Sequence, residues 1–233
     1  MLFRSNGPLT GPLAARAKPL PAAIAEYVAR HDLELDSFAG VEAQVAALSD
    51  DIAYNNHDID DGLRAGLFAV ADLAEVPLVG PVFAEVAARY PRLELGRLIG
   101  ESIRRLIDRM VGDVLAESRA RIAALRPDSP EAVRRLGRPL IAFSSDMNEQ
   151  QKLLRAFLFR RMYRHARVTE TTDHARQVVD DLFKRFMAKP ELLPAEWLAH
   201  AERPQGAKLA RLVADYIAGM TDRFALAEHH KVV

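Results

Sequence analysis

Cysteine is absent from the 233-residue sequence, which excludes disulfide scaffolds and zinc or iron–sulfur sites built on cysteine ligands. Neither sign of charge is in excess, because 32 Lys and Arg residues balance 32 Asp and Glu residues. A near-zero net charge leaves a nucleic-acid partner open but does not support one. Runs of about 18 apolar residues are also missing, and the N-terminus has no apolar signal-peptide core. We therefore expect no membrane partner and a cytoplasmic location.

β-Structure has little support in the pattern, since only residues 137–144 (“GRPLIAFS”) are a candidate for an extended segment. Elsewhere, apolar residues recur at the spacing of one helix face. Pro77, Pro91 and Pro190 mark helix ends, because proline cannot continue a helix. “RPDSP” at 126–130 indicates a turn with a helix start behind it. The sequence predicts an all-α fold, with helices over residues 21–30, 41–58, 61–75, 80–89, 96–125, 146–165, 169–190 and 205–230.

The start of the chain has a different composition from the rest. The stretch “NGPLTGPLAARAKPLP” is rich in glycine and proline, which is typical of a loop. We interpret residues 1–20 as a loop or a truncated start, and residues 21–233 as the helical part of the chain.

An acidic stripe lies within residues 42–66, “EAQVAALSDDIAYNNHDIDDGLRAG”. At about 100° per residue, Asp50, Tyr54, His57 and Asp58 fall on one helix face. Two interpretations are open: a solvated face, or a site for a cation or a substrate hydroxyl. Alanines beside the stripe, and the lack of a cation one turn from the acids, favour the site, for which carboxylates suit Mg²⁺ or Mn²⁺. The opposite face is predicted to be an apolar seam of Val41, Val45, Leu48 and Ile52.

Residues 37–68, “SFAGVEAQVAALSDDIAYNNHDIDDGLRAGLF”, resemble one helix of the HD-type deoxynucleotide triphosphohydrolases, specifically the bacterial deoxyguanosinetriphosphate triphosphohydrolase-like proteins. Two other segments support the resemblance, “EYVARHDLELD” before this helix and “NEQQKLLRAFLFRRMYRHARV” at 148–168. The resemblance covers nearly the whole chain. It implies a multi-helix HD-type phosphohydrolase fold, of which residues 21–233 are the C-terminal part.

The resemblance implies roles for three residues of the stripe, through the family motif D-x-x-x-Y-x-x-x-D. Asp50 matches the aspartate that completes a site for a divalent metal, Mg²⁺ or Mn²⁺. Tyr54 matches the tyrosine that contacts the deoxyribose, and Asp58 matches the aspartate that binds the sugar 3′-hydroxyl. Spacings of four and eight residues place these groups along one helix face.

The resemblance also implies substrate-binding residues on the later helix. Arg155 and Tyr163 match positions that meet phosphate and base or sugar, and their spacing of eight residues predicts one shared helix face. An arginine suits phosphate because it is a fixed charge with forked donors. His165 is a further candidate substrate-binding residue.

The family metal site also takes a histidine and a His-Asp pair from helices that precede this region. His31 is the only histidine upstream of Asp50, and we interpret His31 and Asp32 as structural or surface residues, because a lone dipeptide is a weak motif. His57 is interpreted as orienting a phosphate or carboxylate. We therefore expect an incomplete fold that lacks the N-terminal metal-ligand helices, and weak or no activity from this chain alone.

Two functions remain open at this point. By resemblance, the chain supplies the nucleotide pocket of an enzyme that hydrolyses a dNTP, with dGTP expected, to deoxynucleoside and triphosphate, and no catalytic residue is assigned within it. Assembly into a homo-oligomer is expected by the same resemblance. The alternative is a non-catalytic helical interaction or regulatory module, or an inactive fragment, that kept the fold and lost the metal site.

Overall fold

The computed structural model describes residues 20–199 and 205–232, and every regular element in these ranges is helical. The all-α fold class is confirmed. The loop predicted over residues 1–20 lies almost wholly outside the described residues. By packing, the chain divides into two compact units, unit 1 ending at Met162 and unit 2 beginning at Tyr163.

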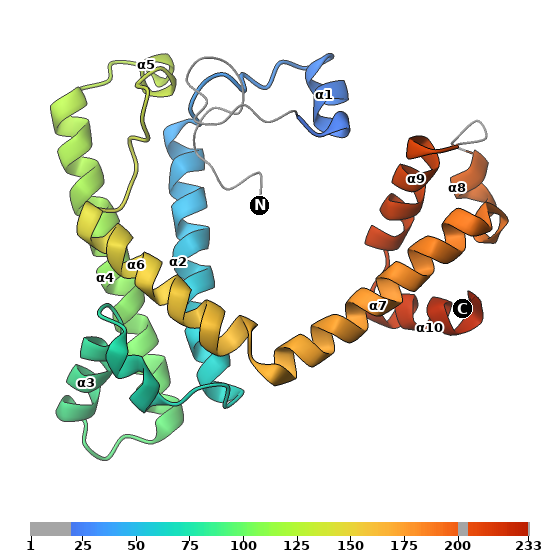
Figure 1. Ribbon diagram of the computed structural model, residues 1–233. Helices are drawn as coiled ribbons and strands as arrows, with labels where there is room; N and C mark the ends of the chain where they lie inside the picture. The colour runs from blue at the N-terminus through green and yellow to red at the C-terminus, as the bar shows by residue number, and fades with distance from the viewer. Residues whose placement is uncertain (1–19, 200–204, 233) are drawn as a thin grey trace. The chain divides into compact units, whose positions relative to one another are not determined.

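Unit 1 contains the helices that carry the acidic stripe and the later helix with Arg155 (Figure 1). Its elements are α1 (Ala22–Val28), α2 (Val41–Arg64), the 3-10 helix η1 (Val70–Glu75), α3 (Gly80–Arg89), α4 (Leu95–Leu125), α5 (Pro130–Arg134), α6 (Ser145–Leu158) and most of a π-helical turn, η2 (Phe159–Tyr163).

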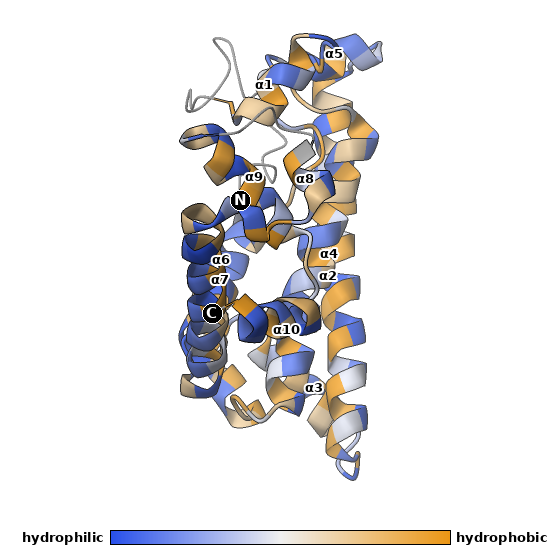
Figure 2. Ribbon diagram, turned by 90° about the vertical axis from the view of Figure 1, so that its right-hand side faces the viewer, coloured by the Kyte–Doolittle hydropathy of each residue, from blue (hydrophilic) through white to orange (hydrophobic). Residues whose placement is uncertain are grey.

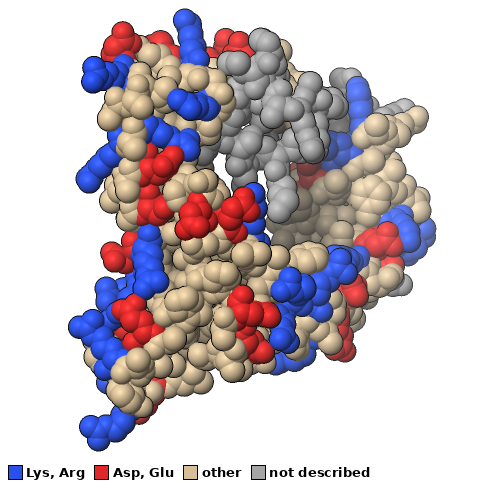
Figure 3. All heavy atoms as spheres, turned by 60° about the vertical axis from the view of Figure 1, so that its left-hand side comes forward, with Lys and Arg blue, Asp and Glu red and all other residues tan. Residues whose placement is uncertain are grey.

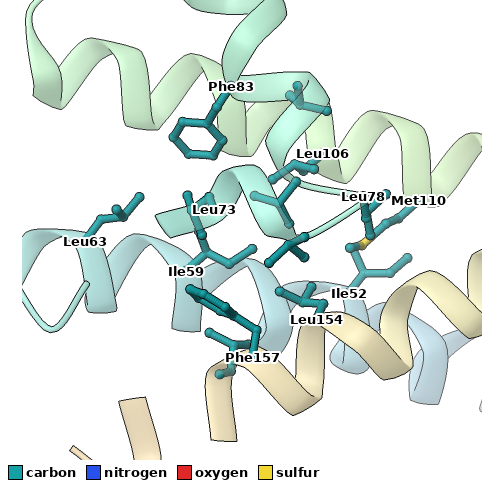
Figure 4. Packing of buried hydrophobic residues seen from close by; sticks show 14 of the residues in the cluster. Ile52, Ile59, Leu63, Leu73, Leu78, Phe83, Leu106, Met110, Leu154 and Phe157 are labelled. Carbon is teal, nitrogen blue, oxygen red and sulfur yellow. The ribbon is translucent and has the colours of Figure 1, made fainter. Parts of the chain in front are cut away.

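The core of unit 1 forms where α2, α4, η1, α3 and α6 meet. Helix α2 packs along α4, α3 packs on α4, and α6 lies across α2 (Figure 1). Figure 4 shows Leu154 and Phe157 of α6 pointing toward Ile52 and Ile59 of α2. Phe157 is 1% exposed and Ile59 is 0% exposed, so this contact belongs to the centre of the core. The packing fixes α6 on the buried face of α2 that carries Ile52 and Ile59.

Helix α2 is one continuous helix, so the break predicted between residues 58 and 61 is wrong. The helix ends in a Schellman motif, in which the N–H of Leu67 bonds to the carbonyl of Gly62 at 2.9 Å and that of Gly66 to Leu63 at 3.2 Å. Gly66 has a φ of +66°, which favours glycine because a Cβ is strained there. The helix predicted over 61–75 is therefore two elements, the end of α2 and η1.

Residues 137–144 contain no β-strand, because side chains from neighbouring helices take up their backbone donors. Gln44 of α2 is fully buried, and its Oε1 accepts hydrogen bonds from the N–H groups of Leu140 and Ile141, both at 2.9 Å. The Nε2 of Gln44 donates to the carbonyl of Ala39 at 2.6 Å. One glutamine thus joins the start of α2 to the segment that leads into α6.

Helix α4 holds the rest of this segment. Ser118 Oγ accepts a hydrogen bond from the N–H of Ala142 at 3.3 Å. The Asp113 carboxylate accepts from the N–H of Ser144 at 2.8 Å and from its hydroxyl at 2.6 Å. Ser144 is the N-cap of α6, since its Oγ accepts from the N–H of Met147 at 3.1 Å. The start of α6 is therefore fixed by groups on α2 and α4.

An ion-pair network joins α3 to α4 on the surface of unit 1. Arg105 pairs with Glu85 and donates to Glu101 at 2.9 Å, and Arg109 pairs with Glu85 at 2.6 Å. Arg104 donates a further hydrogen bond to Glu101 at 2.9 Å. On the face shown in Figure 3, acidic and basic side chains are interspersed over the described residues, in keeping with the balanced net charge.

We expect acid to weaken this α3–α4 network. Hydrogen bonds from Arg104 and then Arg105 lower the pKa of Glu101 from its ordinary 4.5 to about 2. Since the unfolded chain then takes up this proton at a higher pH than the folded chain, the stabilisation is complete above pH 4.5 and is lost as the pH falls toward 2. Glu101→Gln, compared with wild type in urea unfolding at a series of pH values, should lose less stability over this window. Parallel pH profiles would contradict the prediction.

Unit 2 contains α7 (Ala166–Ala188), η3 (Pro190–Leu192), α8 (Ala195–Ala199), α9 (Ala207–Ala218) and α10 (Asp222–Val232). Both α9 and α10 pack on α7. The helix predicted over 205–230 is therefore wrong in extent, because α9 ends at Ala218 and α10 starts at Asp222. His229 of α10 contacts Asp181 of α7 at 3.1 Å, and this hydrogen bond lowers the pKa of Asp181.

In the two ranges described, no helix is long and apolar enough to cross a membrane. Hydrophilic residues recur along α4, which is 31 residues long (Figure 2).

Candidate functional site

The acidic stripe lies on the outer side of α2, with its last member turned inward. Asp50 and His57 are exposed, and Tyr54 is 45% exposed. Asp58 is only 9% exposed, although it lies one turn beyond Tyr54. Because burial of a carboxylate is costly without partners, Asp58 belongs to a structured environment and not to a freely solvated face. The predicted solvated-face interpretation therefore does not fit this residue.

The predicted apolar seam of α2 is correct at one end and wrong at the other. Ile52 is 6% exposed, whereas Val45 is 44% exposed. The reason is that the start of α2 is buried through Gln44, which binds the segment leading into α6, and not through a valine. Further along, the buried face continues with polar as well as apolar residues: Ile52, Asn55, Asn56, Asp58, Ile59, Gly62 and Leu63.

A chain of hydrogen bonds links this face of α2 to Arg155 on α6. Asn55 Nδ2 donates to Oε1 of Gln151 at 3.1 Å, and Arg155 Nη1 donates to the same oxygen at 3.4 Å. Asn55 is 5% exposed and Gln151 is 1% exposed, while Arg155 is exposed. Asn55 directly follows Tyr54 in the sequence. The structure thus links Arg155, through Gln151, to the helix that carries the acidic stripe.

The single helix predicted over 146–165 is wrong in extent. Helix α6 ends at Leu158, and residues Phe159–Tyr163 form a π turn, whose wider turn shifts the helical register. Tyr163 is the first residue of unit 2. His165 is the N-cap of α7, where its Nδ1 accepts a hydrogen bond from the N–H of Arg167 at 3.3 Å. His165 therefore has a structural role as the cap of α7, whether or not it also contacts a substrate.

The π turn is tied to η1 by ion pairs within unit 1. Arg161 Nη2 lies 3.2 Å from Asp72 Oδ1, and Arg160 Nη2 lies 3.9 Å from Glu75 Oε1. Both pairs are largely exposed, so each contributes little to stability. The two pairs thus join arginines of the basic segment after α6 to acidic residues of η1. Arg155 lies within α6 and is linked to α2 through Gln151.

The described residues do not by themselves fit a divalent metal. Asp50 supplies a carboxylate suited to Mg²⁺ or Mn²⁺, but no group of three or more His, Asp or Glu side chains within the described ranges could hold an ion. His31 and Asp32 have local contacts instead. His31 lies against the ring of Tyr27, with 4.9 Å between centroids, and Asp32 accepts from the N–H of Glu34 at 2.8 Å.

Comparison with known proteins shows which proteins this chain is similar to. A model of the Phosphohydrolase-associated domain matches residues 141–231. A deoxyguanosinetriphosphate triphosphohydrolase-like protein of Parvibaculum lavamentivorans is 53% identical over 231 residues, which are 99% of this chain and 58% of that protein. This chain is related to the deoxyguanosinetriphosphate triphosphohydrolase-like family. The resemblance seen in the sequence is confirmed.

Two further relatives carry the same name. The protein of Azorhizobium caulinodans is 53% identical over 232 residues, covering 98% of this chain and 58% of its own length. The protein of a Caulobacter species is 48% identical over 231 residues, covering 99% of this chain and 58% of its own length. The chain therefore spans less than two thirds of the length of the curated relatives that it matches.

Sequence reasoning missed Asn55 and Gln151, the pair that joins the two helices of the site. A signal for Asn55 was present, because at about 100° per residue it falls close to Leu48 and Ile59 on the inner side of α2. An amide on an inner helix face needs a hydrogen-bond partner. The sequence could not name Gln151 as that partner, since it lies 96 residues away.

Proposed function

We propose that residues 21–233 supply the nucleotide-binding part of a metal-dependent dNTP triphosphohydrolase, with dGTP as the substrate. The observation that supports the proposal is the hydrogen-bond chain that links Arg155, through Gln151, to Asn55 of α2, the helix that carries Asp50, Tyr54 and Asp58. The name that the relatives carry, deoxyguanosinetriphosphate triphosphohydrolase-like protein, is consistent with this substrate. A cytoplasmic location and assembly into a homo-oligomer are parts of the same proposal.

Each residue has a chemical role in the proposal. Asp58 accepts a hydrogen bond from the 3′-hydroxyl of the sugar, and Tyr54 packs against the deoxyribose. Arg155 binds triphosphate oxygens through its forked donors. Tyr163 and His165 contact base, sugar or phosphate, although the structure places them in unit 2.

Asp50 is proposed as one ligand of a divalent cation, Mg²⁺ or Mn²⁺. Such a cation, when bound, offsets negative charge on phosphate oxygens. Since no group of three or more possible ligands occurs among the described residues, no step of hydrolysis is derived from this chain.

Calorimetric titration of the chain with dGTP tests the proposal. We expect wild type to bind dGTP, and Asp58→Asn to lose at least tenfold in affinity, about 1.4 kcal/mol, because a buried acceptor for the 3′-hydroxyl is weakened. Asp60→Asn is the matched control, since Asp60 lies two residues away on α2 and pairs with Arg64 at 2.8 Å. Equal loss in both variants, or no binding by wild type, would overturn the proposal.

A second candidate is a non-catalytic module that binds nucleotide or protein without hydrolysing dNTP. The lack of a three-ligand metal group in the described residues favours it. Release of triphosphate from dGTP in the presence of Mn²⁺, measured for this chain and for a version extended upstream, separates the two candidates. Release by the extended version that is lost in Asp50→Ala supports the hydrolase, whereas binding without release in both versions supports the module.

A further inference from the structure

Gln151 occupies an unusual position for a polar side chain. It lies on α6 with 1% of its surface exposed, and its Oε1 accepts two hydrogen bonds, from Asn55 of α2 and from Arg155 one turn further along α6. A single buried oxygen is thus the only hydrogen-bonded link between Asn55 and Arg155 in the described residues. Sequence reasoning assigned no role to it.

The orientation of the Gln151 carboxamide follows from its partners. A guanidinium can only donate, so the atom that faces Arg155 must be the oxygen. The amide nitrogen Nε2 is then directed elsewhere, where it is buried and has no hydrogen-bond partner. An unpaired buried donor is unfavourable, and natural proteins contain few of them. The carboxamide of Gln151 is therefore oriented so that its oxygen accepts two hydrogen bonds while its nitrogen makes none.

This imbalance argues against a role in packing alone. Apolar side chains at both 151 and 55 would fill the same space and leave no buried donor unpaired, since replacing both partners of a buried hydrogen bond by apolar groups can cost little. Uncompensated polar groups of this kind are expected where a structure is organised for a function. The contact that Gln151 makes with its oxygen orients the guanidinium of Arg155.

We propose that Gln151 is a positioning residue, which together with Asn55 of α2 orients the Arg155 guanidinium for binding of a triphosphate group. This inference rests on the proposed function for its ligand, a nucleoside triphosphate. The positioning itself rests only on the contacts within unit 1. A guanidinium that is already oriented loses less rotational freedom when it binds an oxyanion, so affinity rises.

NMR of the arginine side chains tests the positioning directly. The Nε–Hε signal of Arg155, assigned by its loss in Arg155→Lys, should move in Gln151→Leu, because the guanidinium loses its acceptor. In Gln151→Glu the signal should stay ordered, since a carboxylate still accepts from both partners. Gln150→Leu is the control, because Gln150 bonds only to Asp146 among the described side chains.

Binding of dGTP and of inorganic triphosphate supplies the second measurement. We expect Gln151→Leu to weaken both by at least fivefold under conditions where urea unfolding shows the variant to be folded, although its midpoint falls because Asn55 loses its acceptor. Should Gln151→Leu not fold, Asn55→Leu breaks the same link from α2 and is measured in its place. An Arg155 signal that does not move, or unchanged affinity in a variant whose signal has moved, would overturn the inference.

The two proposals fail in different ways. If wild type binds neither dGTP nor inorganic triphosphate, the proposed function is wrong, and the Arg155 signal still decides whether Gln151 orients the guanidinium. If wild type binds dGTP and Gln151→Leu behaves like Gln150→Leu in both measurements, the positioning role is wrong and the proposed function stands.

Discussion

Replacing Gln44 with leucine should lower the free energy of unfolding of unit 1 by about 3–5 kcal/mol. Gln44 is fully buried and makes three hydrogen bonds, to the N–H groups of Leu140 and Ile141 and to the carbonyl of Ala39. Leucine has a similar volume, so the packing is largely kept while three backbone groups lose their partner. Each such unpaired group costs about 1–3 kcal/mol, and burial of the extra apolar surface offsets part of the sum.

Urea unfolding followed by circular dichroism measures this change. Gln150→Leu is a suitable control, because Gln150 is half-buried and bonds only to the exposed Asp146, so its midpoint should move little. Gln44→Leu should also loosen the start of α6, which is the helix that carries Arg155. Similar midpoints for the two variants would show that Gln44 does not hold the segment before α6.

The second large effect is expected at Gly62, near the end of α2. A Cβ at this position would lie 2.2 Å from Cε1 of Phe68, which is a forbidden approach. Phe68 cannot swing aside freely, because it is 6% exposed and packs edge-to-face on Phe157, with 5.1 Å between ring centroids. Gly62→Ala should therefore destabilise the protein by about 1–3 kcal/mol through overpacking, even though alanine gains about 1 kcal/mol of helix propensity.

Gly100 provides the matched comparison for this effect. It also lies inside a helix, α4, but a Cβ there meets no atom within 4 Å. Gly100→Ala should therefore stabilise the protein by up to about 1 kcal/mol. Thermal unfolding of both variants should move the melting temperature in opposite directions. A rise in both would mean that the Phe68 ring adapts and that Gly62 is not needed for close packing.

The class of the fold could be predicted because apolar spacing and proline positions are local signals. The helices over 80–89 and 96–125 agree closely with α3 and α4. Helix ends failed where the deciding contact lies outside the helix. The break was predicted between residues 58 and 61, yet α2 continues to Arg64, and its interior residue Gly62 makes room for Phe68.

The site could be predicted only in part, for the same physical reason. The spacing of Asp50, Tyr54 and Asp58 is visible within nine residues of sequence. The burial of Asp58 and the link from Asn55 to Arg155 depend on how α6 crosses α2, which local periodicity does not encode. Likewise, no local signal marked the π turn at Phe159–Tyr163, which ends the regular α-helix at Leu158.

Residues 137–144 obtain their shape from acceptors on other parts of the chain. The donors at 140, 141, 142 and 144 are met by side chains of Gln44, Ser118 and Asp113. These eight residues, grafted alone into another protein, would lack the side-chain acceptors that fix their backbone. A graft that keeps the conformation of this segment would also have to include α2 and α4, which carry those acceptors.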